Sequence, residues 1–228
     1  MSSLDHATHS SIVSFIWNIA DDVLRDLYVR GKYRDVILPM TVLRRLDAVL
    51  EPTKKAVLAM KVSLDKAGIT NQDAALRQAA GQAFYNTSKF TLRDLRARGS
   101  HHQLRADFEA YLDGFSPNVQ EILDNFEFRN QIPRLSKADA LGTLIEKFLD
   151  PTLNLTPNPT MNGDGSVKLP PLDNHAMGTV FEELVRRFNE ENNEEAGEHW
   201  TPRDAVKLMA RLIFLPIADK IESGTYLL

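Results

Sequence analysis

The chain has 228 residues, and its 27 Lys and Arg against 31 Asp and Glu give a formal net charge of −4. Hydrophobic residues make up 43% and charged residues 25%, as in ordinary folded proteins, so disorder over the whole length is excluded. The lack of cysteine excludes a disulfide framework, a cysteine-ligated zinc site and a cysteine nucleophile. The sequence shows no signal peptide and no apolar run long enough to span a membrane, so we expect a cytoplasmic protein.

The first predicted helix carries a stripe of apolar residues at helical spacing. Ser10 or Ser11 is suited to cap its N-terminus, and Gly31 is suited to stop it. The second helix is predicted over about 33–50 and contains Pro39. Because proline removes a helical hydrogen bond, we expect either a kink at this position or a helix start near Leu38.

The remaining helices of the first 150 residues follow from the same periodicity. Glu51-Pro52-Thr53 predicts the start of a third helix that ends before Gly68. Further helical patterns occupy residues 72–85, 101–113, 117–126 and 136–149. We therefore predict a mainly α fold, with an N-terminal helical bundle domain over residues 1–150.

The composition changes after this domain. Residues 151–172 are rich in Pro, Gly and Asn, which is typical of a linker or connecting loop. Asp173 or Asn174 then predicts the cap of a new helix, and Thr201-Pro202 predicts another helix start. The final residues resemble the beginning of a buried strand. We therefore expect residues 173–228 to hold only the start of a further domain.

Basic residues gather in two stretches despite the acidic total. Residues 25–61 hold nine Lys and Arg against four Asp and Glu, and residues 86–105 hold five against one. A basic face of this kind can bind a nucleic-acid backbone, and the candidates are Lys89, Arg93, Arg96 and Arg98. The alternative is that these charges are ordinary solvated helix surface.

The most distinctive segment is 189–203, which ends in Glu-His-Trp-Thr-Pro-Arg. It places an aromatic and a basic side chain beside a predicted helix N-terminus, where free N–H groups and the helix dipole favour an anion. A small ligand with an aromatic ring and a carboxylate would suit this corner. A capped helix start with Trp200 packed beneath it is the alternative.

Four segments, in chain order, resemble the modification subunit (HsdM) of type I restriction–modification systems. They are IWNIAD at 16–21, YRDVILPMTVLRRLD at 33–47, MGTVFEEL at 177–184 and EEAGEHWTPR at 194–203. The resemblance concerns the N-terminal part of that subunit. It implies a helical bundle domain followed by the first helices of an α/β methyltransferase domain that uses S-adenosylmethionine.

The resemblance implies an adenine-specific DNA methyltransferase that acts on the N6 atom. It also implies DNA, a specificity subunit, a restriction subunit and a second methyltransferase subunit as partners. A Glu-x-aromatic-Thr-Pro-Arg motif of the family helps to bind the methyl donor, and the matching residues here are Glu198, His199, Trp200, Thr201, Pro202 and Arg203. Relatives usually have Tyr or Phe at the position of Trp200.

Relatives continue into a Gly-rich cofactor loop and an Asn-Pro-Pro-aromatic motif that holds the flipped adenine, and neither motif occurs in this sequence. We therefore expect a truncated methyltransferase domain at 173–228, with no catalytic residue and no metal site. The chain alone is expected to be inactive and to bind S-adenosylmethionine weakly or not at all. The alternative is a stand-alone helical protein-interaction or DNA-binding module without catalysis.

Overall fold

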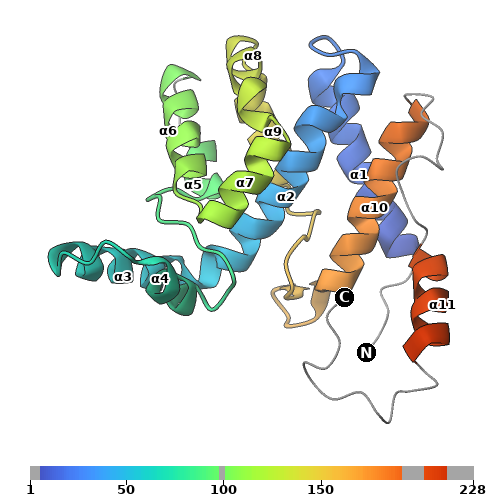
Figure 1. The fold of residues 1–228 in the computed structure, drawn as a ribbon. Helices are drawn as coiled ribbons and strands as arrows, with labels where there is room; N and C mark the ends of the chain where they lie inside the picture. The colour runs from blue at the N-terminus through green and yellow to red at the C-terminus, as the bar shows by residue number, and fades with distance from the viewer. Residues whose placement is uncertain (1–5, 98–100, 192–202, 215–228) are drawn as a thin grey trace.

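The computed structural model describes residues 6–97, 101–191 and 203–214 (Figure 1). These residues form a mainly helical fold in which helices pack around an apolar core. The sheet structure of the described residues is one two-stranded hairpin. The predicted mainly α class is therefore confirmed. None of the described helices is both long and apolar enough to cross a bilayer.

Helix α1, His6–Leu24, differs at both ends from the predicted helix. It begins before Ser10, so Ser10 and Ser11 are interior helical residues and not caps, because a capping preference is weaker than continued helical packing. The chain leaves the helix well before Gly31, which lies instead in the 3-10 helix η1, Arg30–Lys32.

Helix α2, Arg34–Leu50, lies at the centre of the molecule (Figure 1). It begins near the predicted position and continues through Pro39, so the suggested start near Leu38 is wrong. The proline costs one backbone hydrogen bond. Most side chains of α2 are buried, and this packing outweighs the loss.

Helices α3 and α4 lie side by side and project from the body (Figure 1). The 3-10 helix η2, Glu51–Thr53, leads into α3, Lys54–Lys66, which confirms the predicted third helix. Helix α4, Asp73–Ala80, ends five residues before the predicted limit of 85. Gly81 adopts a left-handed conformation with φ of 64°, which terminates the helix there.

The middle of the chain holds a short helix that the periodicity did not indicate. Helix α5, Leu92–Arg96, is a single short segment with a capping box, in which Thr91 and Asp94 bond to each other's backbone N–H. Helices α6, His101–Asp113, and α7, Pro117–Asn125, agree with the prediction.

After η3, Phe128–Asn130, the chain forms α8, Ile132–Lys137, and α9, Ala140–Phe148. Helix α9 corresponds to the predicted helix at 136–149 but begins four residues later, and α8 lies mostly before that range and was not predicted. Asp139 separates them with a φ of 57°, a conformation that an α-helix cannot accommodate. The periodicity continues across this break, which explains why it was missed.

The connecting segment 151–172 is packed onto the helices. It contains a hairpin of β1, Thr160–Met161, and β2, Val167–Leu169, which the sequence analysis did not predict. Its ends are anchored by three buried leucines, namely Leu153, Leu155 and Leu172.

Arg45 of α2 holds both ends of this segment. Its buried guanidinium donates from Nη1 to the carbonyls of Leu155 (2.8 Å) and Leu172 (2.7 Å). Its Nη2 donates to Oδ1 of Asn174 at 2.9 Å. One side chain therefore joins α2 to the segment and to the start of the next helix.

Helix α10, Asn174–Glu191, belongs to the same apolar core as α1 and α2. Asp173 caps it by accepting the N–H of Ala176 at 2.7 Å, as predicted. Near its other end, Phe188 lies against Trp17 of α1, with ring centroids 4.8 Å apart. Helix α11, described over Arg203–Phe214, follows.

Candidate nucleic-acid interface

Helix α5 carries two of the predicted DNA-binding residues. Leu92 and Leu95 are fully buried, which seats the helix against its neighbours α6 and α9. Arg93 and Arg96 are exposed, and their spacing of three residues places them on one side of the helix. The short helix thus presents two guanidinium groups to solvent from a fixed position.

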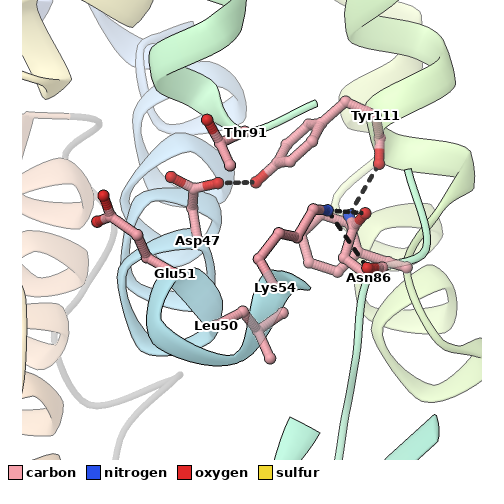
Figure 2. Close-up of a pocket in the computed structure, with 8 residues that line it drawn as sticks. Asp47, Leu50, Glu51, Lys54, Asn86, Thr91 and Tyr111 are labelled. Atoms are coloured by element: carbon pink, nitrogen blue, oxygen red, sulfur yellow. Dashed lines mark hydrogen bonds between the residues drawn. The ribbon is translucent and has the colours of Figure 1, made fainter. Parts of the chain in front are cut away.

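A buried carboxylate behind α5 helps to fix that position (Figure 2). Oδ1 of Asp47 accepts the backbone N–H of Leu92 at 3.2 Å and the hydroxyl of Tyr111 at 3.0 Å. Burial raises the pKa of Asp47, and these hydrogen bonds oppose the rise. Burial and the nearby Asp47 raise the pKa of Tyr111 well above its usual value. Asp47 therefore connects α2, α5 and α6.

Lys54 lies close to this carboxylate, as Figure 2 shows. Its Nζ donates to Oδ1 of Asn86 at 2.9 Å, and Asn86 in turn donates to the carbonyl of Tyr111 at 3.0 Å. Burial lowers the pKa of Lys54 to about 8. The cavity among these side chains is about 10 Å³, which leaves room for about one water molecule. The cluster therefore holds neighbouring parts of the fold together, and its cavity is too small to bind a ligand.

Among the described residues, Arg93 and Lys89 each lie near one neighbouring side chain. Nη2 of Arg93 lies 3.5 Å from Oε1 of Glu51, with side-chain exposures of 68% and 45%, so water screens this pair strongly. Nζ of Lys89 lies 4.9 Å from the ring centroid of Phe90. Both side chains can turn toward a phosphate at small cost. Arg96 is exposed on the same helix.

The structure thus brings Arg93 and Arg96 together and places Lys89 just before the helix. Arg98 lies outside the described residues. Phe90 and the nearby Tyr85 are buried, so they serve core packing and not base stacking. The DNA-binding role of the basic residues stays a prediction.

The predicted cofactor segment falls almost entirely outside the described residues. This applies to Glu198, His199, Trp200, Thr201 and Pro202. Arg203 begins α11, but its side chain also lies outside the description. The assignment of this segment to S-adenosylmethionine therefore stays a prediction.

The residues that support α5 were not among the predicted site residues. Asp47, Lys54 and Tyr111 are polar, and nothing in the sequence indicates that they meet in the interior. A Thr-x-x-Asp pattern at 91–94 was the available signal for the helix itself, because it is typical of a capping box.

The described fold is that of a mainly helical protein that exposes Lys89, Arg93 and Arg96 on and beside α5. Residues 12–148 match the model of the HsdM N-terminal domain, and residues 172–225 match that of N-6 DNA Methylase. The first match covers more than half of the chain, so the protein belongs to the HsdM N-terminal domain family. The resemblance to the N-terminal part of a type I modification subunit is thereby confirmed. No curated protein and no solved structure matches the chain.

Proposed function

We propose that the chain forms the N-terminal part of the subunit that methylates N6 of adenine in DNA, within a type I restriction–modification complex. The observation that carries the proposal is the order of the two family matches, an HsdM N-terminal domain followed by an N-6 DNA methylase segment. Its partners are DNA, the specificity subunit, the restriction subunit and a second methyltransferase subunit.

In this proposal the helical domain, residues 1–150, contacts DNA and the partner subunits. Residues 151–172 connect it to the catalytic domain, which begins at 173. The limits of the matched ranges, 148 and 172, support this division. The chain alone does not methylate DNA, because the motif that would hold the extruded adenine is not among its residues.

S-adenosylmethionine is the proposed methyl donor. Residues 198–203 contribute to its site, with Trp200 as an aromatic surface and Arg203 at the start of α11. The match of residues 172–225 to a methylase family supports this role, since the segment lies within the matched range. The cofactor supplies the methyl group, and these residues bind and orient it.

The test is methyl transfer by the modification subunit that carries these residues, assembled with its specificity subunit. With S-adenosylmethionine labelled in its methyl group, the label should enter DNA as N6-methyladenine after digestion to nucleosides. Trp200→Ala should weaken cofactor binding measured by calorimetry. Label on cytosine would contradict the proposal, and an unchanged dissociation constant would remove Trp200 from the site.

The DNA contact is tested separately in the same complex. The double variant Arg93→Glu and Arg96→Glu should weaken DNA binding and lower the slope of log K against log salt by about two. Lys168→Glu, which reverses an exposed charge on the hairpin, is the control. Equal affinities of the double variant and the unaltered complex at low salt would exclude α5 from the interface.

A further inference from the structure

The tip of the β1–β2 hairpin contains the sequence Asn162-Gly163-Asp164-Gly165-Ser166. All five residues are exposed, and Asn162–Gly163 is the one Asn-Gly step in the 228 residues. An Asn-Gly step is chemically special, because a glycine lacks the side chain that would hinder its own backbone nitrogen. We propose that Asn162 is a site of spontaneous deamidation, in which the backbone nitrogen of Gly163 attacks the side-chain amide.

The reaction needs no reagent except water. The nitrogen of Gly163 forms a bond to Cγ of Asn162, the bond from Cγ to Nδ2 breaks, and ammonia leaves with the proton from the Gly163 nitrogen. Water then opens the resulting succinimide at one of its two carbonyl carbons. Opening at Cγ gives aspartate, and opening at the main-chain carbonyl carbon gives isoaspartate. The net change is the replacement of NH by O, so mass spectrometry detects it directly.

The reacting groups lie in an exposed turn, in which Nδ2 of Asn162 itself donates to Oγ of Ser166 at 2.9 Å. The N–H of Asn162 donates to the carbonyl of Ser166 at 2.8 Å, and the N–H of Gly165 donates to the carbonyl of Asn162 at 3.1 Å. These bonds hold the two sides of the turn and leave the exposed Gly163 step between them. A Cβ built on Gly163 would meet no atom within 4 Å, so the space beside its α-carbon is open.

The neighbouring Asp164–Gly165 step offers a comparison within the same turn. Oδ1 of Asp164 accepts the backbone N–H of Ser166 at 2.9 Å and its hydroxyl at 2.6 Å. These bonds lower the pKa of Asp164 and keep it ionised. Because the carbon of a carboxylate is a poor target for a nucleophile, Asp164 should react more slowly than Asn162.

The product would alter the hairpin and leave the core intact. Isoaspartate adds one carbon to the main chain at the position where Asn162 closes the turn. Either product adds a negative charge beside Asp164. The pairing of Met161 with Val167 lies next to the modified residue, whereas the buried leucines that anchor the segment lie outside the turn.

The experiment is incubation of the full 228-residue chain at mildly alkaline pH, followed by trypsin digestion and tandem mass spectrometry. Cleavage after Lys147 and Lys168 yields one peptide that contains Asn154, Asn158 and Asn162. Asn158 is an internal control, because it precedes Pro159, whose nitrogen carries no hydrogen and cannot close the ring. We expect a mass shift that grows with time at Asn162 and none at Asn158. An unshifted Asn162, or equal shifts at both positions, would overturn the proposal.

Gly163→Ala tests the attacking atom. The site has open space, and Gly163 does not have the positive φ that Gly165 has at 82°, so alanine should be accommodated. The added methyl group should remove most of the shifted peptide at equal incubation time. A variant that reacts as fast as the unaltered chain would contradict attack by this nitrogen. The same unfolding temperature for both proteins would show that the fold is preserved.

Discussion

Helices α10 and α11 both lie within the segment that matches N-6 DNA Methylase, yet their apolar faces differ. In α10, Val180, Leu184 and Phe188 are almost completely buried against the helical body. In α11, Leu212 is 67% and Ile213 is 61% exposed. The two helices have similar amphipathic patterns, and only the first has its partner surface in the described part of the chain.

This difference shows that the start of the methylase family match does not coincide with the end of the packed helical core. The methylase match begins at 172, but α10 packs on α1 and α2 and completes their core. The body that folds as a unit therefore extends to about residue 191. Helix α11 is a short amphipathic helix, and such helices gain most of their stability from packing.

The largest expected effect comes from truncating the buried face of α10. Leu184→Ala should reduce the free energy of unfolding by about 2–5 kcal/mol, because it removes buried methyl groups and leaves a cavity. Leu212→Ala in α11 is the matched control and should change it by less than about 0.5 kcal/mol. Denaturant unfolding of both variants measures the difference. Equal losses would contradict the comparison.

Arg45 tests how the start of α10 is held. Arg45→Met should reduce the free energy of unfolding by about 2 kcal/mol, because the buried carbonyls of Leu155 and Leu172 would lose their donor. Thermal or denaturant unfolding measures the loss. Arg186→Met, which removes an exposed guanidinium from α10, is the control and should have little effect. If the two variants are equally stable, Arg45 does not anchor the segment.

Lys54 carries a partly buried charge, and its effect on stability should depend on pH. Burial lowers its pKa from 10.5 to about 8, so between these pH values the unfolded chain binds more protons than the folded chain. The contribution of Lys54 to stability should therefore rise with pH across this window, by at most about 1.4 kcal/mol per pH unit. The difference in unfolding free energy between the unaltered chain and Lys54→Met, measured at several pH values, isolates this slope. A constant difference from pH 8 to 10 would show that Lys54 is not desolvated.

The sequence predicts the helices well where apolar periodicity and packing agree. This holds for α3, α6, α7 and the start of α10, whose cap at Asp173 has the expected geometry. The predicted helix bounds are wrong where a local backbone conformation competes with the apolar periodicity. Asp139 interrupts a helix by adopting a positive φ, and Pro39 remains inside a helix because its neighbours are buried.

The candidate interface could be predicted only in part. The basic character of 86–105 is visible in the sequence, because charge is a property of the residues themselves. The support of α5 by Asp47 and Tyr111 is not visible, since the two residues are 64 positions apart and meet only through packing. The hairpin at 160–169 was missed for a different reason, because its strands have only two and three residues and polar residues surround them.

Amide hydrogen exchange along α10 and α11 in the 228-residue chain tests the central claim most directly. Amides in the middle of α10 should exchange only through global unfolding. Amides of α11 should exchange much faster, because the apolar face of this helix is exposed. Protection of α11 equal to that of α10 in a monomeric sample would contradict the account.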